Sequence, residues 1–213
     1  MSCGIPKPGA SEPFTLVTVT RAEVPIWFHV YSTKNHPTQA DMFSRGWGDT
    51  RFAPITAETG TPVHTYYAAS TPECAYMESV LHEIPLAPPG QFDVSELQYY
   101  HLAQVRLPDP LACVSFHTPY LPSLGLARAQ LIGSLPACYA ETRPWAEAAY
   151  RQEIGAQGIA YGSRRGDAAR CLMVFGQRLP DPPLTVLRGE PLAVSPRREE
   201  VLGLVRRLKI HEI

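Results

Sequence analysis

One glutamate of this chain occupies a position where a carboxylate needs either partners or a task. Residues 71–83 are expected to form a helix, because Thr71 is a favourable N-cap and a proline follows it at the first helical position. On such a helix Glu78 shares a side with Cys74 and Leu81. A buried carboxylate is costly when it has no partner. Glu78 is therefore either a functional anion or a residue at the edge of the stripe that reaches water.

Two tyrosines end the segment that precedes this helix. The segment VHTYYAA, residues 63–69, is rich in β-branched and aromatic residues and predicts a strand. Because side chains alternate along a strand, Tyr66 and Tyr67 must point to opposite faces. A tyrosine that faces a pocket can stack on a flat heteroaromatic ring, and the alternative is a pair of half-buried strand aromatics.

An arginine and a serine add polar candidates from other parts of the chain. Arg51 lies in GWGDTRFAP, within an irregular stretch, residues 34–62, of the length that binding loops often have. Its guanidinium suits bidentate binding of a phosphate, and a solvated loop arginine is the alternative. Ser163, in YGSRRG, sits where a predicted strand meets a turn, so that it either bonds a ligand or caps the turn.

These residues need a sheet and helices to bring them together. A second capped helix is predicted over residues 141–155, and an amphipathic helix over 195–210. Further strands are predicted over residues 26–31, 99–107, 158–163 and 169–176. Mixed short strands with a few helices indicate an α+β fold. We expect residues 1–13 to be a loose arm and residues 14–213 to form one domain.

Composition narrows the class of protein. The 213 residues include 19 basic and 20 acidic ones, a net charge of -1 that gives no footprint for nucleic acid or an anionic membrane. No signal peptide or membrane span is recognisable, so we expect a cytoplasmic protein. The 5 scattered cysteines indicate reduced thiols rather than a disulfide framework. The histidines have no metal-binding spacing, and we expect no metal.

Four blocks of the chain, taken in order, resemble the RES domain, a family named for its Arg, Glu and Ser positions. The resemblance covers residues 26–178, and RES domains resemble ADP-ribosyltransferases in fold. The blocks are IWFHVY, GWGDTRFAPI, TPVHTYYAASTPECAYMESVLHE and WAEAAYRQEIGAQGIAYGSRRGDAARCLMVFGQR.

The resemblance places the family's characteristic residues on five positions of this chain. The loop arginine falls on Arg51, followed by an aromatic residue, Phe52. The strand tyrosine falls on Tyr67, the helix glutamate on Glu78 and the serine on Ser163. Because order and local context agree at all of them, the match is more specific than any single motif.

One position departs from the family. RES proteins usually carry an arginine in the first strand, where this chain has His29. A branch of the ADP-ribosyltransferases uses a His, Tyr, Glu set, which His29, Tyr67 and Glu78 would recreate. The change is thus either a functional exchange or a sign of weakened activity, and the sequence leaves both open.

The resemblance implies a toxin-type enzyme that cleaves the nicotinamide–ribose bond of its substrate NAD+, by hydrolysis or phosphorolysis. Glu78 would stabilise the developing ribose cation. Tyr67 would stack on nicotinamide, Arg51 would hold the pyrophosphate and His29 would bond the ribose or carboxamide. Ser163 would orient the nicotinamide side or the acceptor, and Phe52 would join the substrate-binding residues.

The family also implies a partner, an Xre-like antitoxin that blocks the NAD+ pocket. The C-terminal helix is expected to serve either core packing or an interface, and a homo-oligomer stays open. Two alternative functions remain. The protein can transfer ADP-ribose to a macromolecule, or it can be a degenerate RES fold that acts only as an interaction module.

Overall fold

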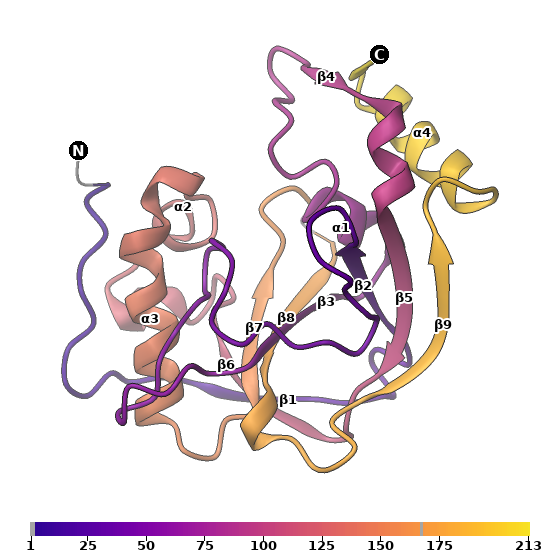
Figure 1. Cartoon of the computed structure of the whole chain (residues 1–213). Coiled ribbons are helices and arrows are strands. Elements are labelled where there is room, and N and C mark those ends of the chain that lie inside the picture. The colour runs from indigo at the N-terminus through magenta and orange to yellow at the C-terminus, as the bar shows by residue number, and fades with distance from the viewer. Residues whose placement is uncertain (1–2, 167) are drawn as a thin grey trace.

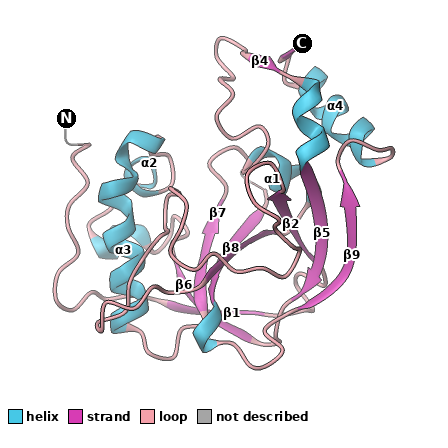
Figure 2. Ribbon diagram, in the orientation of Figure 1, coloured by secondary structure: helices cyan, strands magenta, loops and turns pink. Residues whose placement is uncertain are grey.

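The computed structural model consists of one large mixed sheet with helices gathered at two of its ends (Figures 1 and 2). It describes residues 3–166 and 168–213, so that Met1, Ser2 and Asp167, the last residue of the turn sequence RRGD, lie outside the described residues. The strands of the large sheet are β1 (Leu16–Val19), β2 (Trp27–Ser32), β3 (Thr65–Ala69), β5 (Tyr100–Arg106), β6 (Leu111–Ser115), β7 (Gly158–Gly162), β8 (Arg170–Phe175) and β9 (Thr185–Pro191). Their order across the sheet is β1-β6-β7-β8-β3-β2-β5-β9.

The remaining elements cover the sheet or close its ends. The α-helices are α1 (Pro72–Met77), α2 (Arg128–Leu131), α3 (Tyr139–Gln152) and α4 (Arg197–Arg207). Short 3-10 helices span Val94–Tyr99, Leu121–Leu124, Pro136–Cys138 and Gly176–Arg178. The short strands β4 (Gln91–Phe92) and β10 (His211–Glu212) pair in parallel beside α4. None of the described helices is long and apolar enough to span a membrane.

The sheet opens where β2 leaves β3. β2 pairs with β5 along its length, from Trp27 opposite Val105 to Ser32 opposite Tyr100. Its antiparallel pairing with β3 is instead at Phe28 opposite Ala69. β3 continues the sheet on its other side, where it pairs with β8 over its whole length. Because the two central strands part so soon, backbone groups and side chains between them are free to line a cavity.

Alternation along the strands divides the core into two clusters. On β8, Met173 joins the cluster that α1, α3 and α4 cover, whereas Leu172 and Val174 join the cluster on the opposite face. The same alternation acts on β3. Tyr66 is buried in the second cluster and Tyr67 packs against the first, which is the division that the sequence predicts.

The helix that carries Glu78 is shorter than predicted. It begins at the expected N-cap, where the Thr71 hydroxyl accepts from Cys74 N–H, but it ends at Met77 with Glu78 as its C-cap. The Ser79 hydroxyl donates to the Ala75 carbonyl, which the Ser79 N–H would take in a continuing helix. That N–H instead donates to the Tyr76 carbonyl, and the chain turns away.

The N-terminal arm is not loose. Its backbone N–H groups at Cys3 and Ile5 donate to the Glu141 carboxylate of α3, and the Trp145 indole donates to the Pro6 carbonyl. The expectation of five reduced thiols is also wrong, because Cys3 and Cys138 form a disulfide across 135 residues. Their spacing gave no sign of this pairing, which depends on the path of the arm along α3.

Several elements were not predicted. They are the strands β1, β4, β6, β9 and β10, the helix α2 and the short 3-10 helices. β9 is an edge strand whose side chains are mostly exposed, so its sequence lacks the alternation that marks a half-buried strand. The predicted α+β arrangement of short strands and flanking helices is confirmed.

Candidate functional site

A cavity of about 350 Å³ lies where β2 and β3 part. This volume is within the range of small-molecule sites, roughly 300–1,000 Å³. β2 contributes residues 28–30 to its wall and β3 contributes residues 67–69. The loop before β3, the α1 turn, the start of α3 and single residues of β7 and β8 complete it. The polar residues in the wall are His29, Asp49, Thr50, Arg51, Tyr67, Glu78, Ser79, His82, Glu83, Tyr139 and Tyr161.

Glu78 has one carboxylate oxygen fixed and the other left available. Oε1 accepts from the Ser163 hydroxyl at 2.5 Å and from the Arg164 N–H at 3.0 Å. Oε2 lies 4.0 Å from Arg51 Nη1. The Glu78 side chain is 15% exposed, so the carboxylate is partly desolvated and still reachable from the cavity. An anion held in this way is preorganised for a positive charge that develops beside it.

Ser163 stands behind Glu78 rather than in the cavity wall. Its side chain is fully buried, donates to Glu78 and accepts from the N–H groups of Arg165 and Gly166. The expected direct contact with a ligand is therefore corrected, because these three bonds use its hydroxyl. Of its two predicted alternatives, capping the turn is the one that the structure has, and the same hydroxyl also holds Glu78.

Arg51 is buried next to the cavity but only loosely bonded. Its Nε and Nη2 atoms lie 3.4 Å from the Ser134 hydroxyl and carbonyl, at the long end of hydrogen bonding. The guanidinium carbon lies 5.5 Å from the centre of the Tyr139 ring. Its backbone is anchored more firmly, since the Thr142 hydroxyl of α3 donates to the Arg51 carbonyl. A fork with such long resting contacts is available to an anionic group in the cavity.

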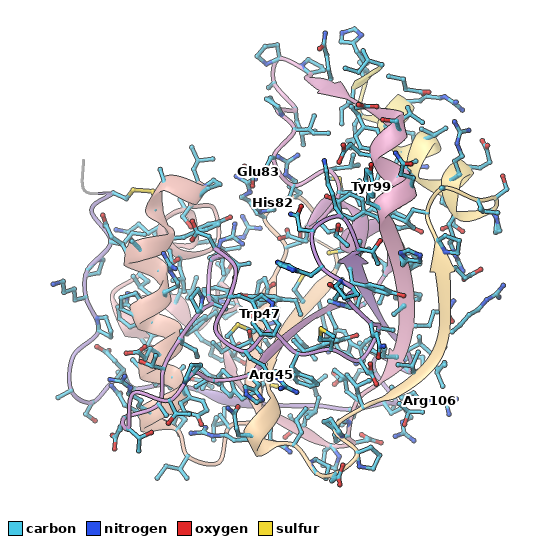
Figure 3. The ribbon with its side chains drawn as sticks, viewed as in Figure 1. Arg45, Trp47, His82, Glu83, Tyr99 and Arg106 are labelled. Carbon is cyan, nitrogen blue, oxygen red and sulfur yellow. A yellow bond between two sulfur atoms is a disulfide. The ribbon has the colours of Figure 1, made fainter. Side chains whose placement is uncertain are left out.

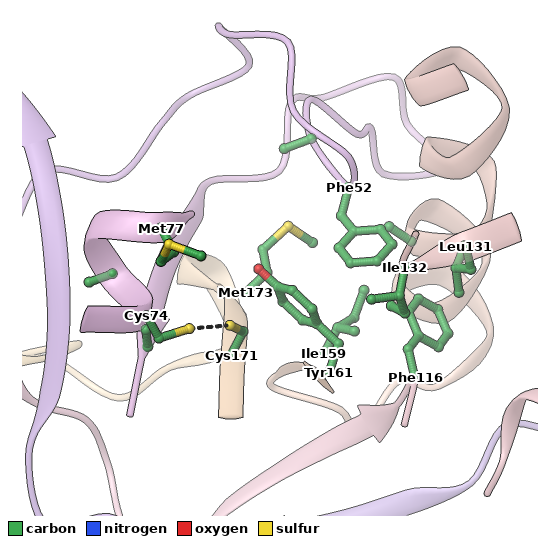
Figure 4. Packing of buried hydrophobic residues seen from close by; sticks show 14 of the residues in the cluster. Phe52, Cys74, Met77, Phe116, Leu131, Ile132, Ile159, Tyr161, Cys171 and Met173 are labelled. Atoms are coloured by element: carbon green, nitrogen blue, oxygen red, sulfur yellow. Dashed lines mark hydrogen bonds between the residues drawn. The ribbon is translucent and has the colours of Figure 1, made fainter. Parts of the chain in front are cut away.

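Phe52 lies in the core, away from the cavity wall. Its ring is fully buried, 5.5 Å from the ring of Phe116 and 5.1 Å from that of Tyr161. Figure 4 shows these three rings packed together with Ile159 and Leu131. The expectation that Phe52 binds the ligand is corrected, because its side chain points into the core while that of Arg51, its neighbour, reaches the cavity. Phe52 thus anchors the loop.

Tyr67 presents its ring to the cavity and its hydroxyl to the Arg51 loop. The hydroxyl shares a hydrogen bond of 2.8 Å with Thr50, whose Oγ1 also bonds both backbone groups of Ala53. Burial raises the pKa of the Tyr67 hydroxyl, so it stays protonated at physiological pH. The residue can therefore offer a neutral aromatic face.

His29 fills the space that opens between β2 and β3. Its Nδ1 lies 2.8 Å from the Tyr67 carbonyl, and its ring centre lies 4.2 Å from that of Tyr66. A carbonyl can only accept, so Nδ1 carries a hydrogen and Nε2 of the neutral ring is an acceptor. Burial lowers the pKa of His29 to about 4, although the bond to Tyr67 opposes the shift. His29 is therefore neutral in the cavity wall.

Acidification is expected to destabilise the fold through His29. Its folded pKa of about 4 is below the ordinary value of 6.5, so the stability it contributes is complete above pH 6.5 and is lost as pH falls towards 4. The loss amounts to up to about 3 kcal/mol. Urea unfolding of wild type and His29→Gln between pH 7.5 and 4.5 measures it. Glutamine keeps a donor for Tyr67 but does not titrate, so a parallel decline in both proteins would contradict the assignment.

Several polar residues of the cavity wall are absent from the predicted site, among them His82, Glu83 and Tyr139. His82 Nδ1 bonds the Glu83 carboxylate, and His82 Nε2 lies 3.2 Å from the Tyr139 hydroxyl. Figure 3 shows His82 and Glu83 between α3 and β5. Tyr139 comes from the start of α3, just before the predicted helix 141–155. The sequence pattern places His82 and Glu83 at the end of a predicted helix and gives no sign of a role in a site.

The site combines an anion, a cation, a neutral imidazole and an aromatic face within one small cavity. Such a set suits a ligand that carries a phosphate and a flat ring, and a reaction in which positive charge develops next to Glu78. Among residues 3–166 and 168–213, no group of three or more His, Cys, Asp or Glu side chains is placed to hold a metal ion.

Comparisons with known proteins identify the family and the fold of the chain. The RES domain model matches residues 26–195. Among solved structures, the M. tuberculosis MbcT-MbcA toxin-antitoxin complex is similar, with a TM-score of 0.60 and 16% identity over 87% of this chain and 90% of that chain. At this identity the similarity shows a shared fold. No curated protein matches the chain. Because the family model spans most of the sequence, this chain belongs to the RES domain family.

Proposed function

We propose that this chain is a toxin-type enzyme that cleaves the nicotinamide–ribose bond of NAD+, by hydrolysis or phosphorolysis. The observation that carries the proposal is the state of Glu78. One of its oxygens is held by Ser163 and the Arg164 N–H, and the other is near Arg51 at the wall of the cavity. Membership of the RES family supports the toxin role.

Cleavage of a glycosidic bond to nicotinamide develops oxocarbenium character on the ribose, as in glycoside hydrolysis. In this proposal the Glu78 carboxylate lies beside that ribose, where its charge favours the transition state over the ground state. Ser163 and Arg164 hold the carboxylate, so it does not need to reorient when the charge forms. The nicotinamide leaves as a neutral molecule. Water, which gives up a proton, or inorganic phosphate then forms the new carbon–oxygen bond to the ribose.

The other wall residues would position the dinucleotide. Tyr67 would stack on the nicotinamide ring, with its hydroxyl anchored to Thr50. Arg51 would exchange its long contacts to Ser134 for the pyrophosphate. The neutral His29 would accept a hydrogen bond from a ribose hydroxyl or the carboxamide through Nε2.

Removal of the Ser163 hydroxyl tests whether its role is to hold Glu78. In Ser163→Ala, Glu78 loses its shortest bond and two backbone N–H groups lose their acceptor. We expect kcat to fall by about tenfold, KM for NAD+ to stay near wild type, and the free energy of unfolding to drop by about 1–3 kcal/mol. Steady-state kinetics and urea unfolding measure these quantities. An increase in KM with unchanged kcat would instead indicate direct substrate contact.

The decisive experiment follows NAD+ loss and nicotinamide release by purified protein, with and without inorganic phosphate. Nicotinamide release in both conditions indicates hydrolysis, and release that requires phosphate indicates phosphorolysis. NAD+ labelled in the adenylate distinguishes the alternative of ADP-ribose transfer, because a transferase leaves label on a macromolecule. If there is no loss of NAD+ and no transfer of label at any phosphate concentration, the proposed enzyme activity is refuted. The degenerate interaction module is then the remaining alternative.

We further propose that an Xre-like antitoxin covers the cavity. Two large apolar side chains close to it are exposed, Trp47 at 54% and Leu135 at 61%. In the sequence, Leu135 immediately precedes Pro136 of the cavity wall, and Trp47 precedes the Asp49–Arg51 part of that wall. Exposed apolar side chains around a pocket favour a protein partner. Adding the antitoxin to an active preparation should stop NAD+ loss, and unchanged activity would contradict this contact.

A further inference from the structure

Two buried thiols lie in contact beneath the cavity. Cys74 of α1 and Cys171 of β8 have their sulfur atoms 3.5 Å apart, and Figure 4 marks this contact with a dashed line. The two residues are 3% and 2% exposed, and neither is part of the Cys3–Cys138 disulfide. Cys171 is also one of the residues that line the cavity. A small molecule in the cavity therefore lies against Cys171, whose sulfur touches that of Cys74.

We propose that Cys74 and Cys171 are a redox site. A peroxide oxidises the two thiols to an intramolecular disulfide, which inhibits the activity of the neighbouring cavity. The sulfurs already touch, and a disulfide requires them to approach from 3.5 Å to about 2.05 Å. The two cysteines are 97 residues apart in the sequence, so that an unfolded chain would rarely bring their sulfur atoms this close. The pair is thus assembled by the fold.

The chemistry balances with hydrogen peroxide as the oxidant. The contact with Cys171 lowers the pKa of Cys74, so we take Cys74 as the sulfur that ionises first. Its thiolate attacks a peroxide oxygen, the O–O bond breaks, and the leaving hydroxide takes up the released proton as water. Cys171 sulfur then attacks the Cys74 sulfenic acid, and its thiol proton leaves with the hydroxide as a second water. Two thiols are oxidised and one peroxide becomes two waters.

The disulfide would act on Glu78 through the short turn that joins them. The Glu78 N–H donates to the Cys74 carbonyl at 2.9 Å. A movement of Cys74 towards β8 would therefore displace the backbone of Glu78. A displaced Glu78 would also lose the bond by which Ser163 holds its carboxylate. The effect on activity rests on the proposed NAD+ cleavage, whereas formation of the disulfide does not.

Mass spectrometry after peroxide treatment of the whole chain tests the site. We expect a loss of two hydrogens that maps to a peptide pair joined through Cys74 and Cys171, reversed by dithiothreitol. Cys171→Ser should show no such loss. The matched control is Cys113→Ser, because Cys113 is free and buried on β6, where burial raises its pKa to about 12. This variant should still form the bond. A Cys3→Ser, Cys138→Ser double variant separates the other disulfide from the result.

The same samples are assayed for nicotinamide release, each relative to its own reduced rate. We expect oxidation to lower the rate by about tenfold or more, because a displaced Glu78 no longer faces the ribose. Absence of the Cys74–Cys171 bond overturns the proposal, and a bond that leaves the rate unchanged overturns the switch. A bond formed in a protein that never cleaves NAD+ would uphold the redox site and refute the proposed function, so the two failures are distinguishable.

Discussion

Glu78→Gln is expected to lower the rate of NAD+ cleavage by about a thousandfold, the largest effect of any single substitution in this chain. Glutamine keeps the size of the side chain, and its amide oxygen can still accept from Ser163 and the Arg164 N–H. What disappears is the negative charge beside the ribose. Because this charge acts on the transition state, kcat should carry the loss and KM should change little.

Nicotinamide release under single-turnover and steady-state conditions measures the effect of Glu78→Gln. The matched control is Glu73→Gln, the same substitution on the same helix, at a side chain that is 59% exposed and paired with Arg207 of α4. We expect this control to keep wild-type rates, since Glu73 is not one of the residues that line the cavity. If Glu78→Gln cleaves NAD+ at the wild-type rate while its melting temperature is unaltered, the central assignment is wrong.

Local patterns predicted much of what surrounds Glu78. The N-cap at Thr71 and the alternation of Tyr66 and Tyr67 depend on residues close in sequence, and the structure has both. The end of the helix depended on one hydroxyl. Ser79 can bond the Ala75 carbonyl or point to water, and a periodic pattern does not distinguish the two. The predicted helix therefore continued past the residue at which α1 ends.

Contacts across long stretches of chain could not be predicted from spacing. Ser163 meets Glu78 across 85 residues, and the sequence allowed it to be read as either a ligand-binding residue or a turn cap. The partial pairing of β2 with β3 decides that His29 fills a gap instead of taking part in a regular ladder. Strand order sets this pairing, and strand order is a property of the whole sheet. His82 was missed for the same reason, because its partner Tyr139 lies 57 residues away.

The state of His29 bears on the exchange of the family arginine for histidine. A histidine in place of the family arginine cannot supply a permanent positive charge here, because burial keeps its pKa at about 4. The cavity then depends on Arg51 for its positive charge, with Arg164 and Arg165 directed to the His82 carbonyl. In the proposed function this arrangement makes recognition of the pyrophosphate depend strongly on one guanidinium.

Arg51→Lys is accordingly expected to raise KM for NAD+ strongly while leaving kcat within a few fold. Lysine keeps the charge but loses the planar fork that bonds two phosphate oxygens at once. Charge-assisted bonds of this kind contribute about 2–3 kcal/mol, which corresponds to roughly a 30–150-fold loss in kcat/KM.

The matched control for Arg51→Lys is Arg151→Lys on α3, where the arginine pairs with Glu147 at 2.7 Å outside the cavity wall. Steady-state kinetics and calorimetric NAD+ binding, with melting temperatures as a check on folding, measure both variants. Because Arg51 Nη1 also lies 4.0 Å from Glu78, a fall in kcat at unchanged KM would mean that the guanidinium acts by orienting that carboxylate. A bidentate role in binding requires the opposite, a weaker affinity with Glu78 chemistry intact, so this pair of measurements decides between the two.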